Sequence, residues 1–465
     1  MTNRRRAAAG LAAVSLLSVG FLHGYLTRLG KVFPDSHLRT FFEGVGSDGG
    51  PAKPPSRASH AAERASAPPR AEVTGGAGRS EDEQAKIEEL LSLGYAAGYE
   101  DAREAKGVVR HDRSVAWEGY NLLLSGHGPG ASLLDMQGKS VHSWTASVAD
   151  VWSAKDPAKA QNGHGSYWKR AHLFGNGDLI AMFERHGLVK LDRRSRILWR
   201  FAGEVHHDLD VDEDGRVFTL LRRAHKIRRL DAKNPTLEDF LLILDRAGRP
   251  LQEISILEAL ERSRYKNLLG VRAWMGGVMF NQGDILHTNT VSVLDGRLAS
   301  RLPAFKKGNV LLALRSLDLI AVLDPGKREI VWGLTGMWFR PHEPVLLDSG
   351  RLLIFDNEGW RPEGTKASRV LELDPLSQQI TWSYGGPPRF HSFVCGQGQR
   401  LPNGNTLITI STEGRVIEVT PGGRVVWEYL NPHSTVVDGQ DRVATIFEMF
   451  RVSSSKVGAL LTTTD

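Results

Sequence analysis

The 465-residue chain contains a single cysteine, Cys395, so no intrachain disulfide can form. A chain of this length can bury a core large enough to be stable without disulfides, so a location outside the cytoplasm stays open. The main part of the chain also lacks an excess of either charge. Residues 1–80 hold 11 Lys and Arg against 5 Asp and Glu, whereas residues 81–465 hold 48 of each sign. This balance argues against nucleic-acid binding, which needs a basic stripe.

Several common catalytic motifs are absent as well. No glycine-rich stretch matches a phosphate-binding P-loop or a dinucleotide fingerprint. No serine lies in a nucleophile elbow. We therefore expect no cofactor.

One uncharged stretch lies near the N-terminus. Arg4, Arg5 and Arg6 precede Ala7–Leu26, which at helical rise matches a hydrocarbon core of about 30 Å. No clear small-residue cleavage site ends the stretch, so we predict an uncleaved signal anchor, a transmembrane helix within residues 1–30; a cleaved signal peptide is the alternative. With the arginines in the cytoplasm, the rest of the chain would lie outside the cytoplasm, held at the membrane.

Two segments separate the anchor from the main domain. Residues 31–79 include a stretch rich in Gly, Pro, Ala and Ser, which predicts a flexible linker. Ser80 and Glu83 have the spacing of a capping box, and apolar residues follow from Ile87. Residues 80–114 are therefore predicted to be a helical segment, with a helix over 80–105. This helix either packs on the main domain or pairs with a second copy of the chain in a homodimer.

From residue 115 onward, one strand pattern recurs six times. A strand ends in an acidic or turn residue, a polar turn follows, and the next strand carries Trp in five of the six copies. The copies start at Leu134, Leu191, Leu244, Leu323, Leu373 and Val419. Their spacing is near the period of a four-stranded blade, so residues 115–465 are predicted to form an all-β, six-bladed β-propeller. The first copy, near Tyr120, lacks its inner strand, which Thr445–Val452 would supply to close the ring.

Three histidines occupy matching places in successive copies. Each lies eight or nine residues before the glycine of an equivalent turn: His207 before Gly215, His287 before Gly296 and His342 before Gly350. Because inner strands line the channel of a propeller, these imidazoles are predicted to converge. Imidazoles can ligate Zn, Cu or Fe, bond strand-end carbonyls, or act as a nucleophile that carries a transferred group. No carboxylate or cysteine recurs at the same offset, which disfavours a metal site.

Arg315 is predicted to reach the same channel. It follows the strand Val310–Leu314, which is expected to pair with the strand that His287 begins. Its guanidinium can bind an anionic group through a planar fork of N–H donors.

These motifs resemble the bacterial arylsulfotransferase family over about residues 117–452. The stretches that carry the resemblance are His206-His207-Asp208, Leu286–Asn289, Ala313–Ser316, Pro341-His342, Leu353–Asn357, Gln399–Ile408 and Val416–Tyr429. The resemblance implies a periplasmic six-bladed propeller that moves a sulfuryl group from an aryl sulfate to a phenolic acceptor, without a nucleotide, through a sulfo-histidine. It implies that His342 is the nucleophile and that His207, His287 and Arg315 surround the sulfuryl and phenolic oxygens.

The chain departs from the family pattern in two places. The family commonly has Gln-His-Thr where this chain has Pro341-His342-Glu343, and this chain has an insertion between His287 and Arg315. Two other functions stay open. One is a non-catalytic, membrane-anchored propeller that binds a ligand or a protein partner. The other is a quinone-dependent dehydrogenase propeller, which usually has eight blades and needs a Ca²⁺ site.

Overall fold

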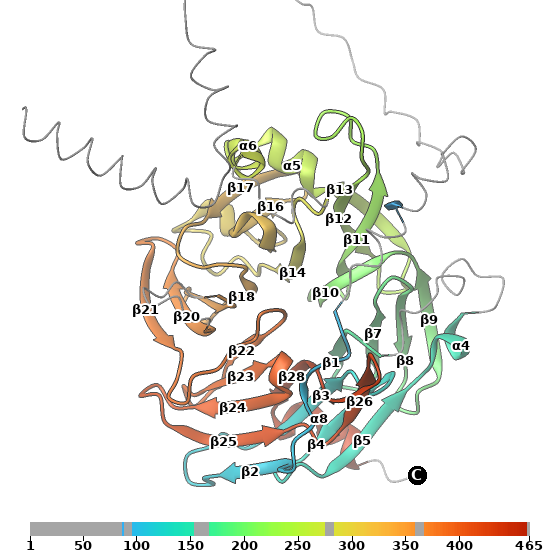
Figure 1. Cartoon of the computed structure of the whole chain (residues 1–465), viewed down its shortest axis with the longest axis vertical. Helices are drawn as coiled ribbons and strands as arrows, with labels where there is room; N and C mark the ends of the chain where they lie inside the picture. The colour runs from blue at the N-terminus through green and yellow to red at the C-terminus, as the bar shows by residue number, and fades with distance from the viewer. Residues whose placement is uncertain (1–85, 88–94, 153–166, 275–282, 359–366, 463–465) are drawn as a thin grey trace, which may run out of the picture. The chain divides into compact units, whose positions relative to one another are not determined.

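The computed structural model describes residues 86–87, 95–152, 167–274, 283–358 and 367–462. These residues form an all-β structure of antiparallel sheets with a few short helices, as the sequence predicts (Figure 1). The predicted anchor Ala7–Leu26 and the predicted linker lie outside the described residues. Within the described ranges, no helix is both long and apolar enough to cross a membrane.

Six of the sheets found in the described residues have four or five strands, and each has nearly consecutive strand order. The first sheet has the order β28 (Ile446–Val452), β3 (Tyr120–Ser125), β4 (Gly130–Leu134) and β5 (Ser140–Thr145). The second has β6 (Arg170–Leu173), β7 (Leu179–Phe183), β8 (Gly187–Leu191) and β9 (Ile197–Ala202). The third has β10 (Val205–Val211), β11 (Val217–His225), β12 (Thr236–Leu244) and β13 (Pro250–Ser255).

The remaining sheets follow the same plan. The fourth has β14 (Thr288–Val293), β15 (Val310–Leu314), β16 (Leu319–Asp324) and β17 (Glu329–Leu334). The fifth has β18 (His342–Leu346), β19 (Leu352–Asp356), β20 (Arg369–Asp374) and β21 (Gln379–Tyr384). The sixth has β22 (Gln397–Arg400), β23 (Thr406–Ile410), β24 (Arg415–Val419), β25 (Val425–Leu430) and β2 (Gly107–His111). A three-stranded sheet holds β1 (Gly98–Asp101), β27 (Gln440–Ala444) and β26 (Ser434–Val437).

Within the described ranges the helices are short, and all except α8, which follows the last strand, lie between strands. The α-helices are α4 (Val148–Val151), α5 (Ile256–Arg262), α6 (Asn267–Trp274) and α8 (Ser454–Thr462). The 3-10 helices are η2 (Pro303–Phe305), η3 (Arg315–Leu317) and η4 (Ser411–Glu413). Because η3 follows β15 directly, it fixes where the chain places Arg315.

The first strands of neighbouring sheets pack against one another. In this way β6 contacts β10, β10 contacts β14, β14 contacts β18, β18 contacts β22, and β22 contacts β28. The backbone N–H of Ala171 in β6 donates to a carboxylate oxygen of Glu448 in β28 at 2.9 Å. The residues of these first strands are therefore brought toward one another, although their sheets are far apart in sequence.

The tryptophans of the repeat connect neighbouring sheets. Three of them donate their indole N–H to a backbone oxygen in a turn of another sheet: Trp144 to Gly177 at 3.0 Å, Trp382 to Pro421 at 2.9 Å, and Trp427 to Met136 at 3.0 Å. Trp suits this position because one side chain supplies a large apolar surface and a hydrogen-bond donor. This contact gives a reason for the tryptophan in these three copies of the repeat.

The strand pairing confirms the prediction for the first repeat. β28 pairs antiparallel with β3, so Ile446–Val452 supplies the strand that the first copy lacks. A buried ion pair holds it: Arg451 bonds Glu418 and also donates to Asn121 Oδ1 at 2.8 Å. The C-terminal end of the chain is thus joined to strands from both ends of the described domain.

The helix predicted over residues 80–105 is wrong in its last part. Lys86 and Ile87 have helical backbone, but Gly98–Asp101 is strand β1 and pairs with β27. A Cβ atom on Gly98 would lie 2.7 Å from Arg442 Cβ, so this glycine permits a close approach of the two strands. Tertiary pairing therefore overrides the helical pattern of the preceding residues. Residues 80–85 and 88–94 lie outside the described ranges.

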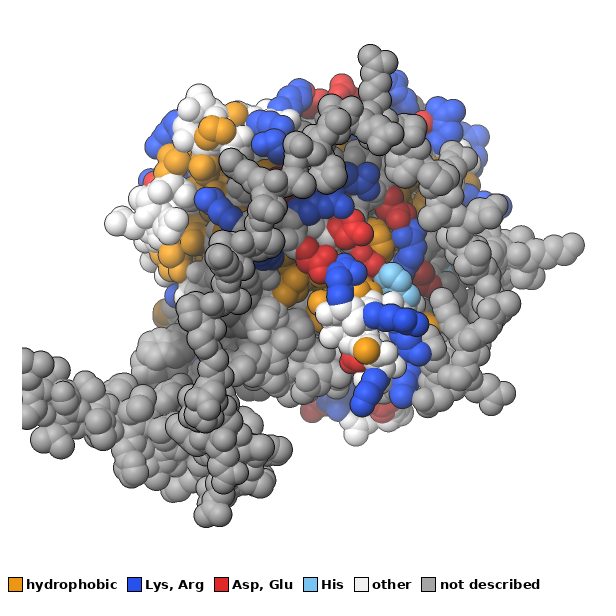
Figure 2. All heavy atoms as spheres, turned by 90° about the horizontal axis from the view of Figure 1, so that it is seen from above, with side chains coloured by type: hydrophobic (Ala, Val, Ile, Leu, Met, Phe, Trp, Pro, Cys, Tyr) orange, Lys and Arg blue, Asp and Glu red, His pale blue; other side chains and the backbone are white. Residues whose placement is uncertain are grey.

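The face of the molecule in Figure 2 presents basic and acidic side chains next to one another. This mixture agrees with the equal numbers of positive and negative side chains in residues 81–465.

Candidate active site

The predicted histidines lie at or close to β-bulges in the first strands of three successive sheets, with His287 directly before β14. The register of pairing shifts between His206 and Leu209, between Thr288 and Thr290, and between His342 and Val345. The backbone is left-handed at His207 (φ 63°), His287 (φ 47°) and Glu343 (φ 49°). Left-handed backbone at residues other than Gly is uncommon and is concentrated at functional sites. Bulges re-aim side chains, so they set the direction of these imidazoles.

His207 and His287 lie side by side around one phenolic oxygen. Their ring centroids are 4.9 Å apart. The hydroxyl of Tyr95 lies 3.0 Å from Nε2 of His207 and 3.0 Å from Nε2 of His287. The structure therefore brings two of the predicted residues together and adds a tyrosine between them.

One hydroxyl hydrogen decides how the protons in this cluster are arranged. His287 Nδ1 donates to Asp284 Oδ2, so His287 Nε2 is left with a lone pair and accepts the Tyr95 hydroxyl. The hydroxyl has no second hydrogen, so His207 Nε2 donates to the Tyr95 oxygen. His207 Nδ1 then accepts from His206 Nδ1 at 2.7 Å. A phenolic oxygen at this position thus donates to one imidazole and accepts from another.

His342 has its reactive nitrogen free. Asn357 Nδ2 donates to the carbonyl oxygens of Ser392 and Cys395, both at 2.6 Å, so Asn357 Oδ1 is the atom that faces His342. His342 Nδ1 lies 2.6 Å from Asn357 Oδ1 and 3.1 Å from the carbonyl oxygen of Arg340. These two acceptors hold the proton on Nδ1. Nε2 therefore carries the lone pair, and it is buried with no hydrogen-bond partner among the described residues.

Arg315 lies beside His287. Its backbone N–H donates to the carbonyl oxygen of His287 at 3.2 Å. Its side chain is buried, and its Nε has no hydrogen-bond partner among the described residues. Burying a guanidinium N–H without a hydrogen-bond partner costs free energy. An anion with oxygen acceptors would supply that hydrogen bond.

The electrostatics of the cluster keep the imidazoles neutral. Burial lowers the pKa of His342 well below its ordinary value, and the positive charge of Arg315 lowers that pKa further. Burial also lowers the pKa of His207, with neighbouring imidazoles adding to the effect. Burial alone would raise the pKa of Asp284, but its contact with His287 brings that pKa below the usual range. At neutral pH the cluster therefore contains neutral imidazoles, with the ionised Asp284 carboxylate beside His287.

Lys169 contacts the tyrosine from its ring face. Its Nζ lies 3.8 Å from the centre of the Tyr95 ring and 3.3 Å from Cys395 Sγ. The carbonyl oxygen of Cys395 in turn accepts from Asn357, which positions His342. A chain of contacts through Lys169 and Cys395 therefore connects the Tyr95 ring with Asn357, which holds the His342 ring.

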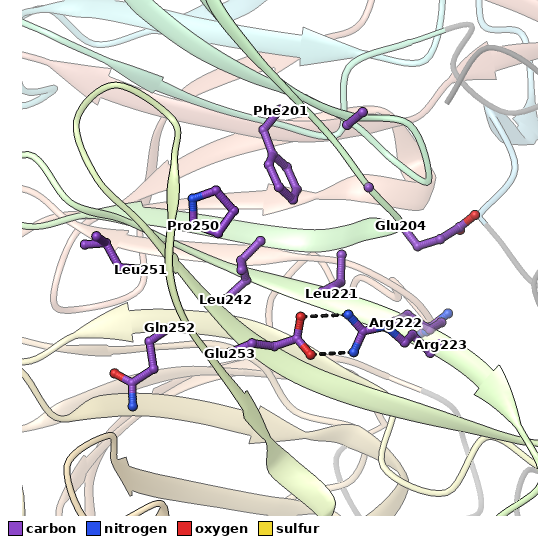
Figure 3. Close-up of a pocket in the computed structure, with 12 residues that line it drawn as sticks. Phe201, Glu204, Leu221, Arg222, Arg223, Leu242, Pro250, Leu251, Gln252 and Glu253 are labelled. Atoms are coloured by element: carbon purple, nitrogen blue, oxygen red, sulfur yellow. Dashed lines mark hydrogen bonds and ion pairs between the residues drawn. The ribbon is translucent and has the colours of Figure 1, made fainter. Parts of the chain in front are cut away.

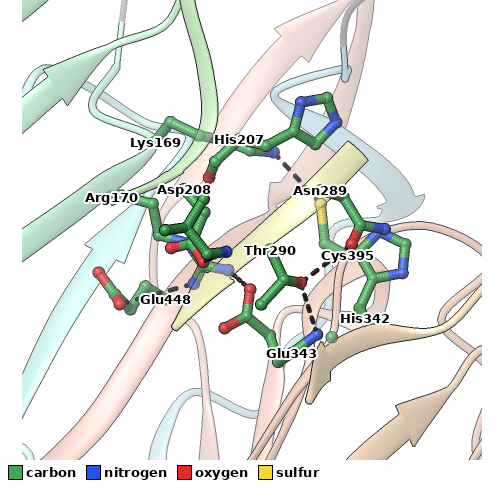
Figure 4. Close-up of polar contacts among 12 residues, drawn as sticks. Lys169, Arg170, His207, Asp208, Asn289, Thr290, His342, Glu343, Cys395 and Glu448 are labelled. Atoms are coloured by element: carbon green, nitrogen blue, oxygen red, sulfur yellow. Dashed lines mark hydrogen bonds and ion pairs between the residues drawn. The ribbon is translucent and has the colours of Figure 1, made fainter. Parts of the chain in front are cut away.

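Arg170 gathers acidic side chains from other sheets close to the imidazoles (Figure 4). It forms ion pairs with Asp208 at 3.2 Å, with Glu448 at 3.5 Å and with Glu343. Its Nε also donates to the carbonyl oxygen of His207 at 3.3 Å. Asp208 and Glu343 directly follow His207 and His342 in the chain, so their bonds to Arg170 hold the two bulges in place.

A separate pocket lies between β9 and the third sheet (Figure 3). Its volume is about 410 Å³, and Phe201, Leu221 and Leu242 contribute to its wall. Arg223 and Glu253 form a double hydrogen bond at its edge. None of the four predicted site residues lines it, so it is distinct from the imidazole cluster.

Sequence reasoning missed several members of the cluster. Tyr95 lies in the segment that was predicted to be helical, although the Gly and Tyr residues around it favour a strand or a turn. Asp284 is three residues before His287, which is the one sequence signal that could have identified it. Within the described ranges, no group of three or more His, Cys, Asp and Glu side chains is arranged to hold a metal ion.

Comparison with protein families gives one match. The family model described as arylsulfotransferase (ASST) matches residues 170–432, which is more than half of the chain. The matched range includes His207, His287, Arg315 and His342. No curated protein matches the chain.

Solved structures similar to this chain share little sequence with it. A protein of unknown function from Bacteroides caccae has 14% identity and a TM-score of 0.43, with 67% of this chain and 94% of that chain covered. The β-propeller domain of Cps50 (Swd1) from Myceliophteria thermophila has 9% identity and a TM-score of 0.40, with 71% and 88% covered. The Dos1 propeller has 10% identity and a TM-score of 0.37, with 68% and 74% covered.

Proposed function

Because the chain belongs to the arylsulfotransferase family, we propose that it transfers a sulfuryl group from an aryl sulfate to a phenol through a sulfo-histidine at His342. One observation carries the proposal. His342 Nε2 is a buried lone pair without a partner among the described residues, while two acceptors hold the proton on Nδ1. A neutral imidazole in this state is a nucleophile that needs no base.

In the first half-reaction, His342 Nε2 attacks the sulfur of the aryl sulfate. The N–S bond forms as the S–O bond to the aryl group breaks, and the phenolate leaves. Arg315 donates to the sulfuryl oxygens, where negative charge is concentrated, and its unpartnered Nε supports this role. The Nε2–H of His207, which donates to Tyr95 Oη in the structure, would donate to the oxygen of the leaving phenolate.

In the second half-reaction, the hydroxyl of an acceptor phenol attacks the sulfur of sulfo-His342. The phenolic proton moves to His287 Nε2, and Asp284 stabilises the imidazolium that forms. The O–S bond forms as the N–S bond breaks, and His342 Nε2 recovers its lone pair. The position of the Tyr95 oxygen between His207 and His287 supports this placement of an aryl oxygen.

We also propose that the six sheets form a closed six-bladed ring, anchored by residues 1–30 to the inner membrane with the ring in the periplasm. The contacts between successive first strands support the ring. The Arg4–Arg6 cluster before an uncharged stretch supports the anchor. Protease added to spheroplasts is expected to digest the ring, and protection of the ring would contradict the periplasmic location.

The test of the transfer reaction uses 4-nitrophenyl sulfate with phenol as the acceptor. The wild-type protein is expected to release nitrophenol continuously, and to carry a sulfuryl group on the peptide that contains His342 when phenol is left out. His342→Ala is expected to lose both properties. His142→Ala is a matched control, because His142 lies in the outer strand β5 and bonds Arg193 instead. A His342→Ala protein with wild-type turnover would contradict the mechanism, and an inactive wild-type protein would favour a non-catalytic binding module.

A further inference from the structure

The phenol that lies between His207 and His287 belongs to the protein itself. Tyr95 Oη is 3.0 Å from each Nε2 atom, which is the position that the proposed reaction assigns to the oxygen of the acceptor. We propose that Tyr95 is a sulfuryl acceptor and that the protein sulfates its own tyrosine. This inference rests on the proposed transfer reaction and names a substrate of the same site.

The backbone around Tyr95 is held in place on both sides. Tyr167 Oη donates to the carbonyl oxygen of Tyr95 at 2.7 Å. The N–H of Ala96 donates to Tyr99 Oη at 2.9 Å, and the N–H of Thr445 donates to the carbonyl oxygen of Ala97 at 2.7 Å. A hydroxyl that the fold holds in the acceptor position has a high effective concentration, because its orientation is fixed before the reaction.

The charges around Tyr95 are compatible with a tyrosine that accepts a sulfuryl group, and also with one that has only a structural role. Burial raises the pKa of Tyr95 well above its ordinary value, so the phenol keeps its proton until a base removes it. His287 provides that base, because its Nε2 lone pair accepts the hydroxyl and its Nδ1 is held by Asp284. The positive charge of Arg315 opposes the rise in the pKa of Tyr95 and adds to the lowering of the pKa of His342.

The reaction balances with an aryl sulfate as the co-reactant. His342 Nε2 first takes the sulfuryl group, with release of the donor phenol. The Tyr95 oxygen then attacks the sulfur, its proton moves to His287 Nε2, the O–S bond forms and the N–S bond breaks. The net change converts the aryl sulfate and the Tyr95 phenol into a free phenol and tyrosine O-sulfate. Tyrosine O-sulfate is itself an aryl sulfate, so the step is reversible through the same groups.

The experiment treats the full chain with 4-nitrophenyl sulfate without added phenol, followed by peptide mapping with mild fragmentation. We expect the mass of one sulfuryl group on the peptide that contains Tyr95, and none on that peptide in Tyr95→Phe or in His342→Ala. Tyr265→Phe is the matched control. It removes a tyrosine hydroxyl that bonds Arg264 at 2.9 Å, away from the imidazole cluster, and it is expected to retain sulfation of Tyr95.

The outcomes separate this inference from the proposed function. If the wild-type protein transfers sulfuryl to added phenol and labels His342 but never labels Tyr95, the inference is wrong and the proposed function stands. If no transfer to His342 or to phenol occurs, both are wrong. Sulfation of Tyr95 that persists in His342→Ala would also overturn the inference, because it would not pass through the proposed site.

Discussion

Replacing Asp284 with Asn is expected to separate the two half-reactions. Asp284 Oδ2 accepts from His287 Nδ1, and Oδ1 has no hydrogen-bond partner among the described residues. Asp284→Asn therefore changes mainly the contact with His287, at nearly constant volume. An amide N–H that faces His287 Nδ1 would force the proton onto Nε2. The lone pair that accepts the phenolic proton would then be lost.

The size of the effect follows from the role of a general base. Such a base contributes about 10²–10⁴ to a rate, and the equivalent Asp-to-Asn change in a Ser-His-Asp triad costs about 10⁴ in kcat. At about 1.36 kcal/mol for each factor of ten, the barrier of the second half-reaction rises by about 3–5 kcal/mol. The first half-reaction changes little, because His342 and Asn357 keep their contacts and nitrophenolate is a good leaving group.

Rapid mixing with excess 4-nitrophenyl sulfate measures both steps. Asp284→Asn is expected to keep a burst of about one nitrophenol per protein, expected for a covalent intermediate, while steady-state turnover with phenol falls about 10²–10⁴-fold. Intact mass should show that the sulfated protein accumulates. Unchanged steady-state turnover would refute the role of Asp284. A folded variant that has lost the burst would place Asp284 in the first half-reaction instead.

Three further predictions address the anion site, pH and stability. Arg315→Ala is expected to slow transfer about 10²–10³-fold but to leave measurable sulfation of His342, and unchanged turnover in the nitrophenol assay would contradict its role. Because the pKa of His342 is lowered in the folded state, mainly by burial, its contribution to stability is present above about pH 6.5 and falls by about 1.4 kcal/mol per pH unit below it. Urea unfolding at pH 7 and 5.5 should therefore show that wild type loses about 1 kcal/mol more than His342→Gln, and equal losses would contradict the neutral buried imidazole. Arg451→Met leaves Glu418 buried without its ion pair, so we expect denaturant unfolding to show a loss of about 3–5 kcal/mol. A loss below about 1 kcal/mol would show that the pair contributes little.

The sequence predicted those features of the fold that repeat. Counting turns placed His207, His287 and His342 in equivalent strands, and the incomplete first copy predicted the pairing of Ile446–Val452 with β3. A repeat fixes the order of strands because each sheet buries its apolar face against the next. These parts of the fold therefore follow from the spacing of apolar and turn residues alone.

The parts that were missed depend on long-range contacts. Tyr95 is separated by 112 residues from His207 and by 192 from His287, and its segment pairs with β27 near the other end of the chain. No local pattern encodes such a contact, and the helical periodicity before Tyr95 favours another structure. The β-bulges were missed for a related reason, because they arise from packing at the centre and not from a turn signal in the sequence.

The contact between Thr445 and the segment after Tyr95 has a consequence for the order of events during synthesis. The N–H and the hydroxyl of Thr445 bond the carbonyl oxygens of Ala97 and Ala96, and Thr445 directly precedes β28. A ribosome makes Tyr95 among the first described residues and Thr445 near the last. His342, Asn357 and Cys395 are therefore synthesised before Thr445 can bond the segment that holds Tyr95 between the imidazoles. Tyr95 is thus made before the histidines that it contacts, but the bonds from Thr445 that hold its segment can form only after all of them have been synthesised.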